Sequence, residues 1–233
     1  MVGLADARVA QEHPQLSFDL NLRSLQVAFE AARKSNVFRF LLPSSASIYG
    51  PADRSPIAED TPPKLTNIYT YHKFMAEKLA ECYTNSYGMN TTVLRLFNVY
   101  GIQGRGILNI LVDKATKEEV IKLYGEKQKR DFIYISDVAK AFANILDIAY
   151  NRYEVFNVGT GIGRSIEDIV NLVKEHFPSM TIEYGKYDGV LYDSVADITR
   201  LKKATGFDPD KSDRNLRKAI GKMIRNSKTG AEK

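Results

Sequence analysis

Hydrophobic residues follow two patterns that alternate along the chain. Apolar positions recur at helical spacing through residues 14–36, and a continuous apolar run, VFRFLLPSS, follows at 37–45. A second helical segment begins at Thr66 or Asn67 and stops at Gly88, and the β-branched run NTTVLRLFNVYG comes after it. This alternation of helices and buried strands predicts an α/β fold, with a parallel sheet wound with helices.

The second half of the chain continues the alternation. The expected strands are EVIKLYG, YEVFNVG and TIEYGKY, and RDFIYISDVAKAFANILDIAY is expected to pass from a strand into a helix. Ser165 and Asp168 form a capping-box pattern at the start of SIEDIVNLVKEHF, and VADITRLKKATGFDPD predicts a further helix before a basic terminus. The Pro-rich segment at 49–64 is expected to be a long loop, and loops of this length in a compact domain often have a function.

Composition narrows the class of protein. The chain has 233 residues, 44% of them apolar, which suffices for a well-packed core. It has neither an apolar run of membrane-spanning length nor a signal-peptide layout, so we expect a cytoplasmic protein without membrane contact. The single Cys82 excludes an intramolecular disulfide and is read as a half-buried thiol. No metal site is expected, because the histidines lack ligand spacing: His13, His72 and His176.

The net charge of +5 is concentrated at the C-terminal end. From Arg200 onward, 11 lysines and arginines stand against 4 acidic residues, so the first 199 residues carry 22 basic and 24 acidic side chains. This distribution predicts a solvated terminal helix and a disordered tail at 225–233, and it argues against a groove that follows nucleic-acid phosphates.

Tyr69 and Lys73 are spaced to lie on one face of their predicted helix. A lysine cation one turn from a phenol favours the phenolate, and this should lower the pKa of Tyr69 from about 10 toward the range of a general base. Ser44 and Ser45 end the preceding strand, where open α/β sheets place their ligands. A serine there can donate a hydrogen bond to a substrate oxygen while the tyrosine moves a proton.

With these residues, the sequence resembles the extended short-chain dehydrogenases/reductases, and within them the NAD-dependent nucleotide-sugar epimerases and dehydratases. The similar segments run in order along nearly the whole chain: DLNLRSLQVAFEAARKSNVFRF, SSASIYG, Tyr69-x-x-x-Lys73 with Glu77 after it, LRLFNVYG, RDFIYISDVAKA, FNVGTG and VADITRLKKATGFDP. As a set, these motifs are highly specific for this family.

The resemblance implies a partial Rossmann-like doubly wound parallel sheet, with a small C-terminal α/β substrate-binding region. Residues 1–100 correspond to the C-terminal part of the Rossmann-like domain, and 101–224 mainly bind substrate, with 130–158 returning to the Rossmann sheet. The glycine-rich dinucleotide fingerprint and the first four strands are not found in the sequence. The later GTGIGRS imitates the fingerprint, but Arg164 replaces its last glycine, so we do not expect this loop to bind the NAD pyrophosphate.

In the family mechanism, a bound NAD takes a hydride from a sugar carbon and returns it to the other face. The resemblance makes Ser45 the hydroxyl that orients the sugar, Tyr69 the acid/base, and Lys73 both the group that tunes the Tyr69 pKa and a ligand of the nicotinamide ribose. It places three further residues beside the cofactor: Asn21, Ser44 and Phe97.

The same resemblance predicts a site for a nucleotide-sugar, with a UDP-sugar as the expected substrate. Asn98 and Arg130 take the positions that contact the diphosphate, and Tyr124 lies where the family places residues against the base. Tyr187, with Lys186 beside it, stands where a second phosphate-binding arginine is expected. These residues complete the predicted substrate site.

The class of reaction within the family can be narrowed further. Ala46 and Ser47 stand where the related 4,6-dehydratases carry an Asp-Glu pair, so dehydration is disfavoured. The first hypothesis is therefore a UDP-sugar 4-epimerase-like activity, and the alternative activity is that of a nucleotide-sugar reductase or decarboxylase. A second hypothesis is a pseudoenzyme that binds a sugar nucleotide or a partner without chemistry.

One of two protein partners is expected. The strand VFRFLLP would present an unpaired apolar edge, which invites a chain that supplies the missing N-terminal half. The helices at 14–34 and 66–87 could instead pack in a homodimer, as they do in the family.

Overall fold

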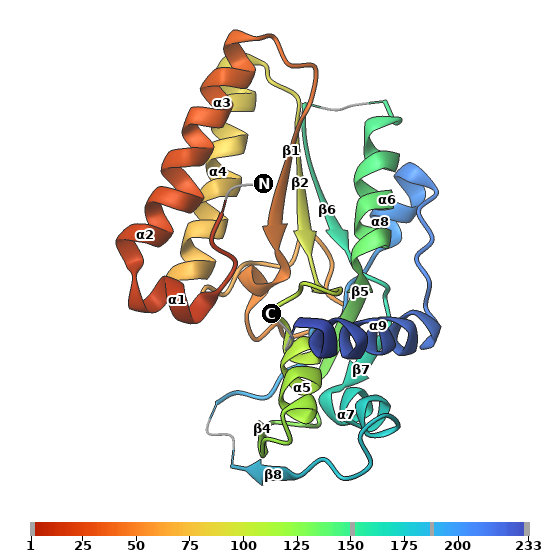
Figure 1. Cartoon of the computed structure of the whole chain (residues 1–233). Helices are drawn as coiled ribbons and strands as arrows, with labels where there is room; N and C mark the ends of the chain where they lie inside the picture. Colours follow the sequence, from red (N-terminus) through yellow and green to blue (C-terminus); the bar gives the residue numbers. More distant parts are fainter. Residues whose placement is uncertain (1–2, 150–151, 187–188, 231–233) are drawn as a thin grey trace.

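Three parallel strands form the main sheet of the molecule (Figure 1). The computed structural model describes residues 3–149, 152–186 and 189–230. The sheet has the order β1-β2-β6, with β1 at Phe40–Ser45, β2 at Thr91–Leu96 and β6 at Tyr153–Val158. Among the described residues β1 pairs only with β2, so β1 is an edge strand, as the sequence predicts.

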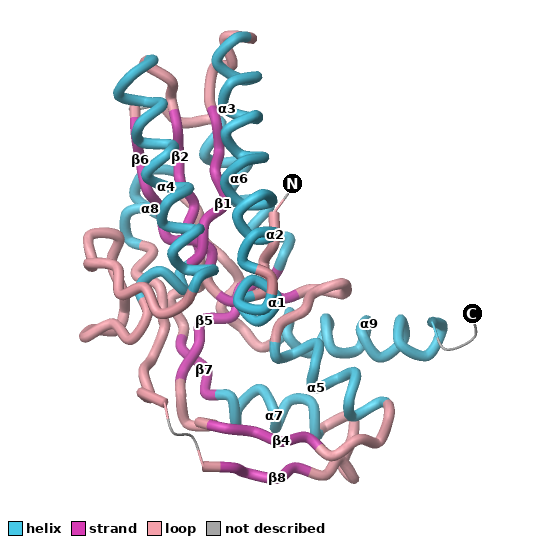
Figure 2. The backbone as a smooth tube through the Cα atoms, turned by 90° about the vertical axis from the view of Figure 1, so that its left-hand side faces the viewer, coloured by secondary structure: helices cyan, strands magenta, loops and turns pink. Residues whose placement is uncertain are grey.

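One face of this sheet is covered by a long helical rod and by α4 (Ile68–Tyr87) (Figures 1 and 2). The rod consists of α2 (Pro14–Phe18), the π-helical turn η1 (Asp19–Arg23) and α3 (Ser24–Lys34). It corresponds to the helical segment predicted over residues 14–36. A short helix, α1 (Ala7–Glu12), precedes it. The apolar face of the rod packs against the sheet, which explains the helical spacing of its apolar residues.

Aromatic stacking ties α3 and α4 to the edge strand. Phe29 of α3 is fully buried, and its ring lies 4.3 Å from the ring of Phe40 in β1 and 4.8 Å from that of Tyr83 in α4. Offset stacking of this kind adds to the free energy gained by burying the rings. These contacts fix how α3 and α4 lie over the amino end of β1.

Local capping sets the ends of α4. Asn67 is the N-cap, because its side chain accepts from the backbone N–H of Thr70 at 3.1 Å while the Thr70 hydroxyl accepts from the N–H of Asn67. Gly88 ends the helix in the left-handed conformation at φ 68°. The predicted bounds of this helix are confirmed.

On the other face, α6 (Ile135–Leu146) and α8 (Thr199–Thr205) complete a three-layer arrangement (Figure 1). Buried side chains of the sheet and of these helices form one core cluster together with Ile133 and Phe207: Leu94, Val138, Ala141, Ile145, Phe156, Val158 and Leu201. Since both faces of the sheet are covered, its strands read as continuous apolar runs.

The segment NTTVLRLFNVYG does not form the single strand that its composition predicts. It forms β2 and β3 (Asn98–Tyr100), which belong to different sheets. The break lies at Phe97, whose side chain is buried and whose N–H donates to Val158 at 3.0 Å. Beyond this point the chain leaves the main sheet, and β3 pairs with β5 (Lys129–Tyr134).

The remaining elements build a second region beyond the ends of the main strands. β7 (Gly163–Ser165) pairs antiparallel with β5, and β4 (Ile121–Tyr124) pairs in parallel with β8 (Ile182–Gly185). Of the segment 130–158, α6 and β6 therefore return to the main sheet, but β5 belongs to this second region. The prediction that 130–158 returns to the Rossmann sheet is therefore wrong for β5, because strand pairing and not chain order decides membership of a sheet.

Three helices enclose the core of the second region: α5 (Ile107–Thr116), α7 (Ile166–Lys174) and α9 (Arg214–Gly230). The predicted capping box of α7 is confirmed, since Ser165 and Asp168 bond reciprocally. The predicted tail at 225–233 is wrong for residues 225–230, which continue α9, while 231–233 lie outside the described residues. An apolar stripe on α9 buries Leu216, Ala219, Ile220 and Met223, and this anchors the helix.

A search of the described ranges finds no helix long and apolar enough to cross a membrane.

Candidate active site

The predicted catalytic residues come together at the carboxyl end of β1. Ser45 ends the strand and caps the 3₁₀ turn η2 (Ala46–Tyr49), with its Oγ 2.8 Å from the Oγ of Ser47. Tyr69 lies in the first turn of α4, and Lys73 follows one turn later on the same face. The strand end therefore meets the start of the helix at the position predicted from the sequence.

Burial controls the charges at this position. It raises the pKa of the Tyr69 phenol, while a hydrogen bond with Ser45 acts in the opposite direction. Burial also lowers the pKa of the Lys73 ammonium, opposed by the negative charge of Glu77. The Lys73 Nζ lies 5.9 Å from the centroid of the Tyr69 ring and donates to the Pro43 carbonyl at 3.5 Å.

The sequence-based prediction that Lys73 lowers the pKa of Tyr69 below its usual value is therefore wrong for this structure. Removing a phenolate from water disfavours the charged form, and at Tyr69 this effect exceeds the opposing interaction. The spacing places Tyr69 and Lys73 on one helix face, as the structure has them, but their solvent exposure could not be predicted from residue spacing.

A buried ion pair that the sequence analysis did not single out lies next to this group. Arg95 of β2 donates to both carboxylate oxygens of Glu77 in α4, at 2.8–3.2 Å, and both side chains are buried. The Ser44 hydroxyl donates to the same carboxylate at 2.5 Å. The available signal was the spacing of Glu77, four residues after Lys73, together with an arginine inside a buried strand.

This polar network continues into the loop after η2. Arg95 donates to the Tyr49 hydroxyl at 2.8 Å, and Tyr49 donates to the Asn157 side chain at 2.7 Å. Asn157 in turn donates to Glu59 through its backbone N–H and to the Ile57 carbonyl through its side chain. These bonds fasten the long loop at 49–64 to β2 and β6.

The structure gives the three predicted cofactor residues different surroundings. The side chain of Asn21 lies in the π-helical turn and bonds to both backbone groups of Leu4, at 3.1 and 3.2 Å. The Ser44 hydroxyl donates a hydrogen bond to Glu77, and the Phe97 side chain is buried in a cluster with Ile57 of the loop at 49–64. Their assignment to the cofactor stays a prediction.

The predicted substrate residues fall into two pairs. Asn98 is exposed at the start of β3, and Arg130 lies on β5, which pairs with β3. Tyr124 ends β4 opposite Gly185 of β8, and Lys186 follows that glycine. Tyr187 lies outside the described residues.

Arg130 already has partners within the chain. It donates to the Tyr192 carbonyl and to the Gln128 side chain, both at 2.6 Å, and its guanidinium lies 4.8 Å from the centroid of the Tyr192 ring. A phosphate would therefore have to share this guanidinium with the loop that contains Tyr192.

The glycine-rich loop GTGIGRS serves a carboxylate of the protein itself. The backbone N–H groups of Thr160 and Gly161 each donate to Asp131 at 2.8 Å, and the Thr160 hydroxyl donates to it at 2.6 Å. A Cβ on Gly159 would lie 2.6 Å from the same carboxylate. These three donors are therefore bonded to Asp131. This agrees with the expectation that the loop does not bind a pyrophosphate.

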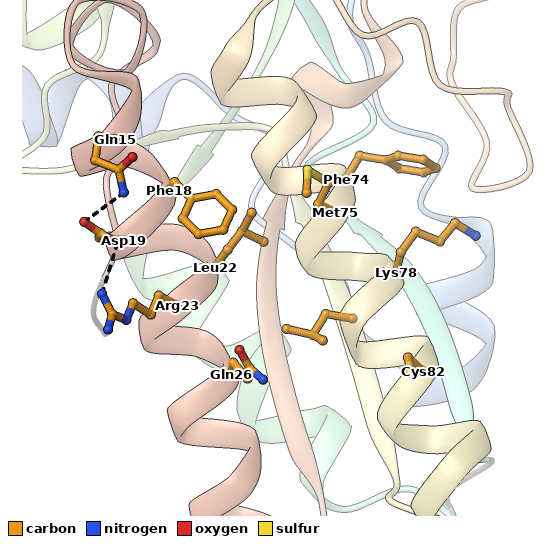
Figure 3. Close-up of a pocket in the computed structure, with 11 residues that line it drawn as sticks. Gln15, Phe18, Asp19, Leu22, Arg23, Gln26, Phe74, Met75, Lys78 and Cys82 are labelled. Carbon is orange, nitrogen blue, oxygen red and sulfur yellow. Dashed lines mark hydrogen bonds and ion pairs between the residues drawn. The ribbon is translucent and has the colours of Figure 1, made fainter.

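A groove runs between η1 and α4 on the outer face of the helical layer (Figure 3). It has a volume of about 790 Å³ and is lined mainly by apolar side chains with charges at its rim. Phe18 and Met75, both more than 40% exposed, face it from the two sides. Cys82, expected to be half-buried, is exposed in this groove.

Within the described part of the chain, no group of three or more histidine, cysteine or acidic residues is arranged to hold a metal ion.

Comparison with known proteins gives consistent matches. The sequence model of the "NAD dependent epimerase/dehydratase family" matches residues 1–159. A UDP-glucuronate 4-epimerase of Thermodesulfobacterium geofontis is 30% identical over 217 residues, which is 88% of this chain and 65% of the relative. The chain spans 61–75% of the length of the first curated relatives it matches.

Two solved structures extend the match over the whole fold. A UDP-glucose 4-epimerase of Thermotoga maritima, solved with UDP-glucose, has a TM-score of 0.86 and 25% identity, and the match covers 100% of this chain and 77% of that one. A UDP-glucose 4-epimerase of Thermus thermophilus in complex with NAD has a TM-score of 0.85 and 27% identity, with coverages of 97% and 76%.

Proposed function

The chain belongs to the NAD dependent epimerase/dehydratase family, and we propose that it acts as a UDP-sugar 4-epimerase-like isomerase. The family and the Rossmann-like α/β fold are those that the sequence predicts, and NAD is the cofactor of this family. The observation that carries the proposal is the meeting of Ser45, Tyr69 and Lys73 at the carboxyl end of β1.

The described residues fit the nicotinamide–ribose end of NAD. The Lys73 ammonium is partly buried beside Tyr69, and the one hydrogen bond found for it in the described part of the chain is the 3.5 Å contact to Pro43. An ammonium has three N–H donors, so Lys73 retains donors for ribose hydroxyls. NAD, when bound, supplies reversible hydride transfer at a sugar carbon.

The chain itself supplies proton transfer and orientation. Tyr69 removes a proton from a sugar hydroxyl and later returns it, and Ser45 donates a hydrogen bond that holds that oxygen in place. The hydrogen bond with Ser45 opposes the effect of burial on the Tyr69 pKa, and the Lys73 ammonium lies 5.9 Å from the centroid of the Tyr69 ring. The low exposure of Tyr69 limits exchange of this proton with water.

We assign the substrate to the UDP-sugars. Asn98 and Arg130 would hold the diphosphate, with Lys186 and Tyr187 as further contacts and Tyr124 against the base. Support comes from the relatives, because the Thermotoga maritima structure contains UDP-glucose and the Thermodesulfobacterium geofontis relative is named for UDP-glucuronate. Neither relative fixes the sugar for this chain.

The test is calorimetric binding of NAD to the purified chain, with and without a UDP-sugar, followed by an epimerisation assay. We expect binding of both ligands and interconversion of the two 4-epimers. Binding of UDP-sugar without turnover when NAD is present would refute the catalytic proposal and favour the pseudoenzyme. Formation of a reduced or decarboxylated sugar would favour the other alternative.

We also propose that the groove between η1 and α4 is covered by a second copy of the chain. Its rim carries both signs of charge, with Asp19 and Arg23 on one side and Lys78 on the other. A two-fold contact places the same patch on both partners, so a patch with charges of both signs can pair with itself. The edge strand β1 leaves room for the other expected partner, a chain that adds strands there.

A further inference from the structure

Three residues on one face of α4 meet three consecutive residues of β1. Tyr69, Lys73 and Glu77 are spaced by four residues each, so they follow one another along the same side of the helix. The contacts pair each of them with a neighbour on the strand: Lys73 with Pro43, Glu77 with Ser44, and Tyr69 with Ser45. The third member of the row, Glu77, has no role in the proposed reaction.

The carboxyl group of Glu77 is hydrogen-bonded from two sides. Only 1% of Glu77 and 8% of Arg95 are exposed, and a charge removed this far from water is stable only when it is paired and hydrogen-bonded. Arg95 supplies three bonds to Glu77, and Ser44 supplies a fourth. This satisfies the carboxylate and fixes its position one turn beyond Lys73.

The arginine is satisfied as well. Its remaining nitrogen, Nη1, donates to the Tyr49 hydroxyl and to the Glu59 carbonyl, both at 2.8 Å. Arg95 is therefore bound toward the loop and the carboxylate, whereas Lys73 lies one helical turn before Glu77. The groups that face this part of the site are Tyr69 and Glu77 from α4, the Pro43 carbonyl from β1 and Arg95 from β2.

We propose that Glu77 is a positioning residue of the reaction site: its carboxylate, clamped by Arg95 and Ser44, keeps Lys73 as an ammonium ion beside Tyr69. This inference rests on the proposed function, because it concerns the same site. Glu77 acts through Lys73 and need not touch substrate or cofactor. The negative charge of Glu77 opposes the tendency of burial to neutralise the lysine.

The proposal is tested by following the ionisation of Lys73 directly. Carbon-13 NMR of the full chain with labelled lysine side chains reports each amine, and the Lys73 signal is identified by its loss in Lys73→Arg. In Glu77→Gln we expect the titration midpoint of Lys73 to fall by roughly 1 pH unit or more, as follows from losing a close opposite charge. An unchanged midpoint would overturn the proposal.

A matched control removes a carboxylate elsewhere. Glu30 of α3 accepts a hydrogen bond from Tyr83 of α4 at 2.9 Å, so Glu30→Gln makes the same chemical change against the same helix, away from Lys73. We expect this variant to leave the Lys73 midpoint in place. An equal fall in both variants would mean that general loosening of α4, and not the charge of Glu77, controls Lys73.

Two further variants separate charge from packing. Glu77→Asp keeps the charge but shortens the clamp, so the melting temperature should fall while the Lys73 midpoint stays near the parent value. The double variant Glu77→Gln with Arg95→Gln removes both buried charges, so the melting temperature should recover while the midpoint stays below the parent value. If the midpoint follows the melting temperature in both variants, the role of Glu77 is structural only.

The titration needs neither NAD nor a UDP-sugar. Failure of the epimerisation assay would therefore leave its result intact. Conversely, a chain that epimerises but shows no change in Lys73 would refute this inference alone.

Discussion

Replacing Tyr69 with phenylalanine removes one oxygen atom and keeps the ring, so it separates chemistry from packing. The ring is buried, and its hydroxyl bonds with Ser45. When that hydroxyl is lost, Ser45 still has Ser47 as a partner at 2.8 Å. No polar group is left without a bond, so we expect a loss of only about 1 kcal/mol in the free energy of unfolding.

The effect on catalysis should be much larger. Loss of a general acid/base lowers turnover by roughly 10²- to 10⁴-fold, which corresponds to about 2.7–5.5 kcal/mol of activation free energy. In contrast, 1 kcal/mol of stability shifts the melting temperature of a chain of this length by only about 2–4 °C. Tyr69→Phe should therefore remain folded and lose nearly all activity.

The assay is the interconversion of a UDP-sugar such as UDP-glucose in the presence of NAD, with UDP-sugar affinity measured by calorimetry. Affinity should stay nearly unchanged, because the predicted nucleotide contacts lie on other elements. The matched control is Tyr83→Phe in the same helix, which loses one hydrogen bond to Glu30 and should keep the parent rate. A full-rate Tyr69→Phe variant would remove Tyr69 from the mechanism.

Three other predictions concern separate features. Burial lowers the folded-state pKa of His72, so the unfolded chain binds the proton first and stability should fall as pH drops below about 6.5; His72→Gln should flatten this decline in thermal unfolding. Gly159→Ala should cost about 1–3 kcal/mol in urea unfolding, because its Cβ would meet Asp131 at 2.6 Å, whereas Gly106→Ala, with its nearest contact at 3.8 Å, should cost little. Met75→Glu should dissociate the proposed dimer in light scattering without unfolding the chain, and an unchanged mass would refute the groove as its interface.

Features set by neighbouring residues could be predicted from the sequence. Asn67 and Gly88 bound α4 because capping depends on groups within a few residues of the helix end. The capping box of Ser165 and Asp168 is readable for the same reason. Tyr69 and Lys73 share a face because helical geometry is independent of the rest of the fold.

Features set by distant partners could not be predicted in this way. The run from Asn90 to Gly101 has uniform strand character, yet it divides at Phe97 because the two parts pair with different strands, β6 and β5. Arg95 lies inside that run, where an arginine is unexpected. Its presence could have indicated a buried anion, but only the fold identifies that anion as Glu77.

The same distinction explains why the predicted direction of the Tyr69 pKa shift was wrong. Residue spacing describes how two charges lie relative to each other, and it correctly brings Lys73 beside Tyr69. It does not describe how much water is removed from them, and burial here raises the pKa of the phenol and lowers that of the amine. Both shifts favour the neutral forms, so spacing alone would leave the pair poorly suited to proton transfer. The hydrogen bond from Ser45 on β1 opposes the first shift, and the charge of Glu77 on α4 itself opposes the second. The proposed acid/base role of Tyr69 therefore depends on the packing of β1 against α4.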